Sequence, residues 1–182
     1  GHFQCRRSKD LVNWEYMGAT MYGLPSWVQP KLNEIRNAMG LANSTTNFSD
    51  DLQFGYWAPC ARKVRDGLYR MYYCIVCPGY IDPTRTSWGE RAFIGLMETT
   101  DPSDLTKWED KGYVITNYSD RDPSKIYVSP TTWESCYYKY NAIDPSYIIT
   151  PEGEHWLIYG SWHSGFAAVE LDAATGKTKV AQ

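Results

Sequence analysis

The chain has 182 residues, a formal net charge of -3 and no long run of charges of one sign. That length is enough for one domain with a sizeable core, and the charge gives no basic stripe of the kind that binds nucleic acid. No apolar stretch approaches the roughly 20 residues of a membrane-spanning helix. We therefore expect a globular chain with neither a nucleic-acid partner nor a membrane span.

Short apolar runs make up most of the chain, and they predict an all-β fold. They are rich in Val, Ile, Tyr and Trp and are separated by Gly, Pro, Asp and Asn, as strands and their turns are. One stretch, residues 29–39, could carry a helical turn, since Pro30 suits a helix start. Long connections at residues 24–51, 78–90 and 117–139 are candidates for loops around a binding site.

A nine-residue motif near the N-terminus occurs twice. Asp10, Leu11 and Trp14 belong to the first copy, and the second copy starts 94 positions later with Asp104, Leu105 and Trp108. We expect each Asp to cap a turn with its carboxylate and each Leu and Trp to wedge between neighbouring sheets. This assigns both aspartates a structural role and no catalytic one.

A second repeat links Ala58-Pro59 to Asp144-Pro145, 86 positions apart, each followed by a turn Gly and an aromatic strand. One unit then consists of an inner strand ending near a Pro, a hairpin, two further strands and the motif with Asp, Leu and Trp. Four antiparallel strands per repeat are typical of a β-propeller blade. We expect one propeller domain, incomplete in this chain, with the end of one blade at 1–18, a second blade at 53–116 and a third at 140–182.

The five cysteines are Cys5, Cys60, Cys74, Cys77 and Cys136, and their odd number argues against a full disulfide framework. Cys74 and Cys77 have the spacing of a metal or redox pair. They lie in an expected strand, however, where residues three apart point to opposite faces. We interpret them as buried small hydrophobic residues and predict no metal site.

Four motifs in order resemble glycoside hydrolase family 43, which contains arabinanases, arabinofuranosidases and xylosidases. They are Tyr56-Trp57-Ala58-Pro59, Asn141-Ala142-Ile143-Asp144-Pro145-Ser146, Tyr159-Gly160-Ser161-Trp162 and Leu171-Asp172-Ala173-Ala174-Thr175-Gly176-Lys177. The resemblance implies a five-bladed propeller. The second and fourth motifs resemble endo-1,5-α-L-arabinanases more than xylosidases.

The resemblance also implies inverting hydrolysis with three inward carboxyl groups, and one of them maps onto this chain. Asp144 falls on the position that raises the pKa of the general acid and holds that acid in place. The general base is expected before Gly1 and the general acid beyond Gln182, so we expect these residues alone to be inactive. Without the resemblance, Asp144 would be an ordinary turn aspartate before Pro145.

Further residues are candidates for contacts with sugar: Trp57, Asn141, Ile143, Ser161 and Trp162. Trp57 either lines the funnel at the centre of the expected propeller or belongs to the hydrophobic core. The resemblance implies no cofactor, with a structural calcium ion in the complete propeller left open, and it implies arabinan or arabinoxylan of plant cell walls as partner. It also implies export to the periplasm, the cell surface or the medium, although no signal peptide is visible.

A non-catalytic carbohydrate-binding or degenerate propeller is the alternative, and an unrelated propeller for protein contacts is less favoured by the motifs.

Overall fold

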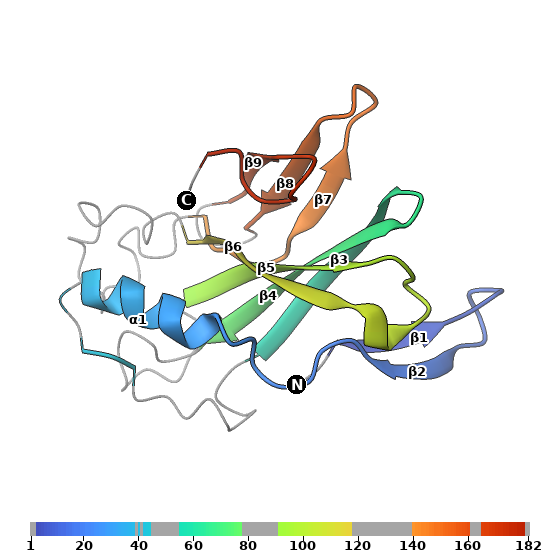
Figure 1. The fold of residues 1–182 in the computed structure, drawn as a ribbon, viewed down its shortest axis with the longest axis horizontal. Helices are drawn as coiled ribbons and strands as arrows, with labels where there is room; N and C mark the ends of the chain where they lie inside the picture. The colour runs from blue at the N-terminus through green and yellow to red at the C-terminus, as the bar shows by residue number, and fades with distance from the viewer. Residues whose placement is uncertain are drawn as a thin grey trace.

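The structure, a computed structural model, describes residues 3–38, 40, 42–44, 55–77, 91–117, 140–160 and 165–180. Its strands form three antiparallel sheets, in each of which consecutive strands are neighbours (Figure 1). The first sheet contains β1 (Gln4–Arg7) and β2 (Glu15–Ala19). The second sheet contains β3 (Gly55–Arg65), β4 (Leu68–Cys77), β5 (Arg91–Thr99) and β6 (Glu109–Thr116). The third sheet contains β7 (Ser146–Ile149), β8 (His155–Tyr159) and β9 (Ala167–Leu171). This up-and-down order is that of propeller blades.

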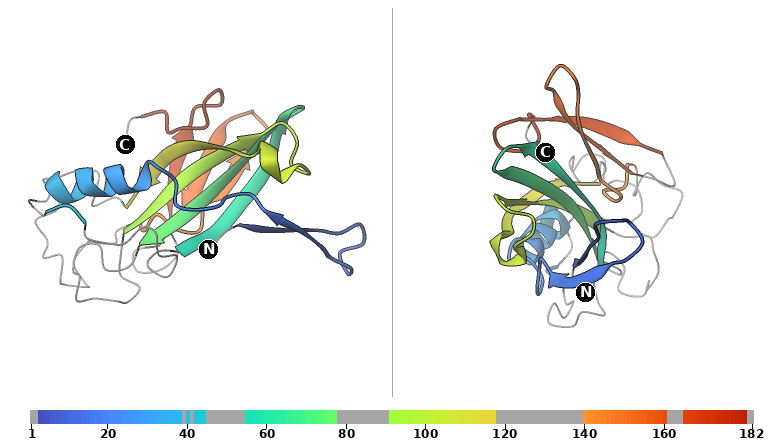
Figure 2. Two further views of the ribbon diagram at one scale, coloured as in Figure 1. Left: turned by 60° about the horizontal axis from the view of Figure 1, so that its bottom comes forward. Right: turned by 90° about the vertical axis from the view of Figure 1, so that its right-hand side faces the viewer.

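The second sheet is buried on both faces, which an antiparallel sheet commonly is not. Along β4, Tyr72 and Cys74 belong to one apolar cluster, whereas Tyr73 and Ile75 belong to another. This alternation has the period of two that a strand requires. Figure 2 (right) shows the second sheet lying between the third sheet on one side and α1 with the first sheet on the other.

The third sheet covers one face of the second sheet through an apolar and hydrogen-bonded interface. The rings of Tyr72 and Tyr147 lie 4.9 Å apart between centroids. Arg70 has no exposed surface, pairs with Glu98 through an Nε–Oε1 distance of 2.8 Å and donates to the carbonyls of Ala173 and Ala174 at 3.0 and 2.9 Å. One buried guanidinium therefore ties β4 of the second sheet to the turn after β9 in the third.

Lys177 makes the reciprocal contact from that turn back to the second sheet. Its ammonium donates to the carbonyls of Lys111, Gly112 and Tyr113 at 2.6, 3.0 and 2.6 Å. Burial lowers the pKa of Lys177 to about 8. The two cationic side chains thus fasten the same interface from opposite sides.

The helix α1 (Val28–Ala38) covers the other face of the second sheet together with Phe3. Its buried residues Val28, Leu32 and Ile35 recur at the i, i+4, i+7 spacing of one helical face. Trp27, just before the helix, donates from Nε1 to Asp110 at 3.1 Å. The helical turn that the sequence predicts at 29–39 is confirmed, and it extends over 11 residues. Within the described ranges, no helix is long and apolar enough to cross a membrane.

The inner strands differ from the expected pattern. The strand β3 does not end near its Pro but runs through Pro59 to Arg65, with an irregular register between Trp57 and Cys60. In the third sheet, β7 begins at Ser146, after Asp144-Pro145. The reason is local: the Pro lacks an N–H and interrupts the ladder without reversing the chain. The hairpins that follow are equivalent, because Gly67 and Gly153 both turn with positive φ, 70° and 85°.

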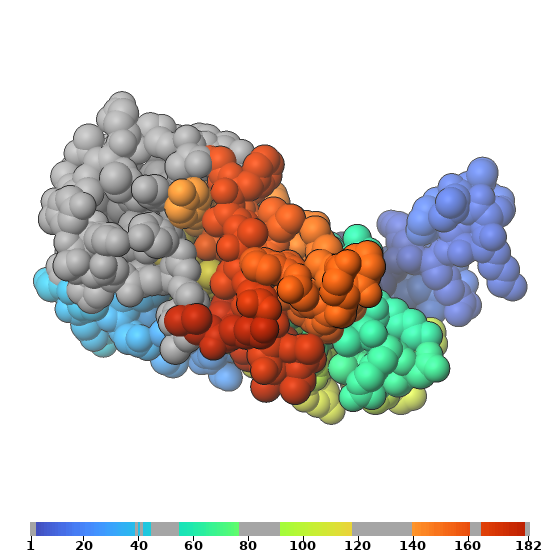
Figure 3. Space-filling model, turned by 90° about the horizontal axis from the view of Figure 1, so that it is seen from above, coloured from blue at the N-terminus to red at the C-terminus, as the bar shows by residue number. Residues whose placement is uncertain are grey.

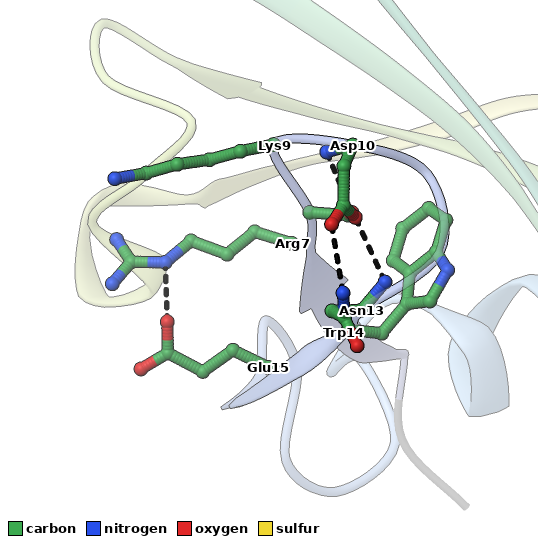
Figure 4. A pocket seen from close by; sticks show the side chains of 7 residues that line it. Arg7, Lys9, Asp10, Asn13, Trp14 and Glu15 are labelled. Atoms are coloured by element: carbon green, nitrogen blue, oxygen red, sulfur yellow. Dashed lines mark hydrogen bonds and ion pairs between the residues drawn. The ribbon is translucent and has the colours of Figure 1, made fainter.

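Both copies of the Asp–Leu–Trp motif form the expected capped turn. Asp10 Oδ1 accepts from the backbone N–H of Val12 and Asn13 at 2.9 and 2.8 Å between β1 and β2 (Figure 4). Asp104 Oδ1 accepts from the Thr106 N–H at 3.1 Å and caps the short 3-10 helix η1 (Leu105–Lys107) between β5 and β6. The hydrogen bonds therefore agree with the structural role predicted for both aspartates.

The wedge expected of the Leu and Trp occurs in the second copy alone. Leu105 lies beside Gly18 of the first sheet, since a Cβ on Gly18 would meet its Cδ1 at 3.5 Å. Leu11 and Trp14 instead are 78% and 52% exposed. Figure 3 shows the turn of the first sheet projecting from the rest of the molecule. The first copy is exposed because no described sheet lies on its outer side.

Candidate functional site

Asp144 lies on a strained turn two residues before β7, the first strand of the third sheet. It is exposed, its φ is 51°, and buried Pro145 follows it. A residue before Pro is pushed toward extended backbone, and positive φ is unusual for any residue except Gly. Ala58, its counterpart in the second sheet, has the same backbone with a φ of 41°. The repeat seen in the sequence is therefore present in the chain's path, and the third-sheet copy carries a carboxylate.

Short backbone hydrogen bonds fold the segment before Asp144 back on its own sheet. The Ile143 N–H donates to the Asn141 carbonyl at 2.8 Å, and the Gly160 N–H donates to the Ile143 carbonyl at 2.9 Å. Gly160, at the end of β8, has a φ of 86°, and a Cβ there would lie 2.6 Å from the Gly165 carbonyl oxygen. The chain at Gly165 can approach Gly160 so closely because residue 160 is a glycine, whereas the Asn141 carbonyl at 3.5 Å would be in ordinary contact with a Cβ there.

Three side chains of the second sheet reach the same segment. Asn117 Oδ1, directly after β6, accepts from the Ala142 N–H at 2.9 Å. Cys60 Sγ on β3 accepts from the Tyr147 N–H at 3.4 Å. Burial raises the pKa of the Cys74 thiol on β4; the nearby Asp144 carboxylate adds to that rise, and a hydrogen bond with the Asp144 backbone opposes it.

The remaining predicted contact residues are placed differently from one another. Trp57 is partly buried against the cluster between the second and third sheets, and a Cβ on Gly55 would lie 2.7 Å from its Nε1, so the indole folds across Gly55. Asn141 and Ile143 are buried. Ser161 and Trp162 lie outside the described residues.

Two buried amide atoms beside Asp144 have no hydrogen-bond partner within the described part of the chain. They are Asn117 Nδ2, a donor, and Asn141 Oδ1, an acceptor. Such atoms are rare in a folded interior. The candidate site therefore consists of an exposed carboxylate at residue 144 and two buried amides, Asn117 and Asn141, in the segments around it.

The sequence did not single out Asn117 or Cys60 as site residues. Asn117 directly follows β6, and Cys60 directly follows the Pro of the repeat. The repeat itself offers a signal, since it predicts that the inner strands of two units lie side by side, and β3 does contact β7. The sequence of neither sheet contains a pattern that would predict the hydrogen bonds of Asn117 and Cys60 to the segment around Asp144.

A surface hollow of about 470 Å³ lies on the first sheet, lined by the hairpin residues Arg7, Ser8, Lys9, Asp10, Asn13, Trp14 and Glu15. Two of its charged side chains pair with each other, with Arg7 Nε 2.8 Å from Glu15 Oε2 (Figure 4). Among the described residues, no three or more His, Cys, Asp and Glu side chains are grouped so that they could hold a metal ion. The hollow belongs to the capped turn, and Asp144 remains the candidate for chemistry.

Comparison with known protein families and proteins gives a consistent result. The model of glycosyl hydrolases family 43 matches residues 1–182. An extracellular endo-α-(1→5)-L-arabinanase of Thermotoga petrophila is 29% identical over 181 residues, covering 96% of this chain and 33% of that protein. A Bacillus subtilis extracellular endo-α-(1→5)-L-arabinanase is 29% identical over 172 residues, covering 94% of this chain and 39% of that protein. The chain thus spans about a third to two fifths of these relatives.

Solved structures agree on the fold. An exo-1,5-α-L-arabinanase from a bovine ruminal metagenomic library superposes with a TM-score of 0.58 at 26% identity, covering 98% of this chain and 46% of that one. A Cellvibrio cellulosa α-L-arabinanase in complex with arabinohexaose superposes with a TM-score of 0.59 at 23% identity, covering 96% and 43%. The chain folds as an incomplete propeller of the five-bladed glycoside hydrolase type.

Proposed function

The chain belongs to glycosyl hydrolases family 43, and on this premise we propose that it is part of an enzyme that hydrolyses α-1,5-linked arabinan with inversion. The observation that carries the proposal is Asp144, an exposed carboxylate on a strained turn just before the first strand of its sheet. The similarity to two endo-arabinanases over nearly the whole chain supports the substrate. The three sheets would be the end of one blade, a complete blade and most of a third.

Asp144 has the chemistry of a pKa modulator. A general acid must still hold its proton near neutral pH, and a neighbouring negative charge raises its pKa. Inversion needs an acid and a base about 6.5–9.5 Å apart, with water between base and sugar. We assign those two roles to carboxyl groups outside this chain, the base in a preceding part and the acid in a following part of the complete propeller.

Substrate contacts are proposed for Trp57, Asn141, Ile143, Ser161 and Trp162. The partly buried Trp57 indole has a flat apolar face on which a sugar ring could stack. Asn141 has an acceptor without a partner among the described residues but is buried, so it would act from beneath the sugar site. Arabinoxylan is a second polymer that such a site would accept. Relatives described as extracellular support action outside the cytoplasm.

The test compares the 182 residues alone with a longer protein that contains them and the remaining blades. Release of reducing ends from debranched arabinan is the readout. We expect turnover by the longer protein and none by the 182 residues. In the longer protein, Asp144→Asn should lower kcat by about 10²–10⁴-fold and leave the affinity for arabino-oligosaccharides nearly unchanged.

Three outcomes would count against the proposal. Turnover by the 182 residues would mean that the acid and base lie within them. Full activity of the Asp144→Asn protein would mean that another residue is the modulator. Binding of arabino-oligosaccharide without any turnover by the longer protein would favour the non-catalytic alternative.

A further inference from the structure

We propose that Asn117 and Cys60, both on the second sheet, are positioning residues that hold Asp144 of the third sheet in its working orientation. The proposal rests on the modulator role proposed for Asp144. It adds that the carboxylate is set by the neighbouring blade, through two hydrogen bonds to the backbone on either side of it.

The first hydrogen bond lies two residues before Asp144. Residues 141–145 belong to no strand, so the N–H of Ala142 has no partner from a sheet ladder. Ala142 and Asn117 are both fully buried, and Asn117 Oδ1 supplies the acceptor at 2.9 Å. Without it the N–H would be buried and unpaired, which a folded chain avoids by moving.

The second hydrogen bond lies three residues after Asp144. The N–H of Tyr147 points at Cys60 Sγ, at 3.4 Å, and not at a carbonyl of its own sheet. Cys60 lies opposite Tyr72 on β4, and the Tyr72 ring contacts Tyr147. The thiol and the ring therefore fix the same residue of β7 against the second sheet.

The turn between these two points needs outside support. Asp144 has a φ of 51° directly before Pro145, a conformation that persists when surrounding contacts over-determine it. Loss of the hydrogen bond at Ala142 would let the turn relax toward extended backbone and swing the carboxylate.

A swung carboxylate has a specific consequence for catalysis. Asp144 would act on the general acid through its charge, and that interaction falls with distance. The pKa of the acid would then fall, so the alkaline limb of the pH profile of kcat would move to lower pH. Sugar contacts made by other residues would be affected less, so KM would change little.

The experiment uses the longer, active protein with Asn117→Ala. We expect kcat to fall at least about tenfold, KM to stay within about twofold, and the alkaline limb to move down by about one pH unit. The Asp144→Asn protein should show no further shift when Asn117→Ala is added, because Asn117 acts through Asp144. Asn117→Asp should restore most of kcat, since a carboxylate oxygen accepts from the same N–H.

Thr116→Val is the matched control. Thr116 is buried beside Asn117, but its hydroxyl donates to the Ala92 carbonyl within the second sheet at 2.9 Å. Its variant should leave the pH profile unchanged. An equal shift in Thr116→Val, or an unshifted profile in Asn117→Ala, would overturn the inference.

Failure of this inference can be told from failure of the proposed function. If Asp144→Asn is fully active, the modulator role itself is wrong. If Asp144→Asn is impaired and Asn117→Ala is not, the modulator role stands and the positioning role falls. If Asn117→Ala does not fold, Cys60→Ala gives the same pH comparison, and an unshifted profile there would equally overturn the inference.

Discussion

The two inner turns at Ala58-Pro59 and Asp144-Pro145 share a backbone but are held in different ways. Around Ala58, Gly55 to Trp57 and Cys60 to Arg65 pair with β4 of the same sheet. Before Asp144, residues 141–143 belong to no strand. The Ile143 carbonyl accepts from the Gly160 N–H of its own sheet, and Asn117 of the neighbouring sheet accepts from the Ala142 N–H. The turn without a carboxylate is fixed within its own sheet, and the turn with one also depends on a hydrogen bond across the interface.

This difference distinguishes a turn of the structural scaffold, at Ala58, from the turn that carries the candidate catalytic residue, Asp144. A turn inside a sheet ladder can be formed as soon as its own strands pair. A turn held across two sheets forms its final geometry when the sheets dock, because its hydrogen-bond partners lie 25 and 87 residues away. We therefore expect changes at the interface between the second and third sheets to affect Asp144 more than changes within either sheet.

The largest effect is expected when the carboxylate is moved from position 144 to position 58, which tests whether the two turns differ in function. In the longer protein, Asp144→Ala combined with Ala58→Asp should leave kcat on arabinan about 10²–10⁴-fold below wild type. The backbone at both positions is alike, but residue 58 is one blade away from the proposed acid. Reducing-end release is the measurement, with Ala58→Asp alone as control. Restored turnover in the double variant would show that position around the funnel does not matter.

Loss of the buried guanidinium at the interface should have the next largest effect. Arg70→Met leaves Glu98 without its partner and the carbonyls of Ala173 and Ala174 without a donor. Breaking a buried ion pair from one side costs about 3–5 kcal/mol. Urea unfolding followed by tryptophan fluorescence measures it.

The exposed pair Arg7–Glu15 provides a control for that effect. Its side chains are 61% and 62% exposed, so Arg7→Met should cost about 0–1 kcal/mol. Similar losses for Arg70→Met and Arg7→Met would mean that the guanidinium does not fasten the two sheets.

A pH-dependent effect is expected from His155, which lies in the third sheet close to the same interface. Tyr147 Oη and His155 Nδ1 are 2.6 Å apart. Burial, and then the charge of Arg70, lower the pKa of His155 below its ordinary 6.5, while Asp172 opposes this. The unfolded chain then takes up a proton first, so the free energy of unfolding falls as pH drops below 6.5.

The His155→Asn protein checks that sign. Its side chain does not titrate, so its free energy of unfolding should fall less than that of wild type between about pH 7 and pH 5. Urea unfolding at several pH values gives the comparison. Parallel pH curves for the two proteins would contradict the prediction.

The smallest effect is expected at the outer turns, where the same contrast recurs. Leu105 is partly buried beside the first sheet, and Leu11 is 78% exposed. In the 182-residue chain, Leu105→Ala should lower the free energy of unfolding by about 1 kcal/mol and Leu11→Ala by less than about 0.5 kcal/mol. Equal losses would show that the wedge at Leu105 contributes nothing.

Local chemistry and repetition made much of the fold predictable from the sequence. Asp10 and Asp104 cap turns because a carboxylate followed by free N–H groups does so in any context. Gly67 and Gly153 mark equivalent hairpins, and the apolar runs of β4 and β5 mark a sheet buried on both faces. Pro30 and the residues after it predict the helix α1, though not the face of the second sheet that it covers.

The contacts around Asp144 could not be predicted in the same way. Asn117 and Cys60 act through backbone groups of a different sheet, and no spacing in the sequence encodes that docking. The sequence alone allows Trp57 to line the funnel or to belong to the core, because it does not reveal that the ring folds over Gly55. The exposure of Leu11 and Trp14 follows from what lies beside their hairpin, which their own motif cannot specify.

The left-handed backbone at residue 144 also constrains how this position can change over generations. Asn and Gly enter that conformation as readily as Asp, whereas β-branched residues do not. Asn is one nucleotide change from Asp. Homologues that have lost catalysis through a change at this residue are therefore expected to carry Asn or Gly there. Their blade structure should be unchanged, and their melting temperature should differ little.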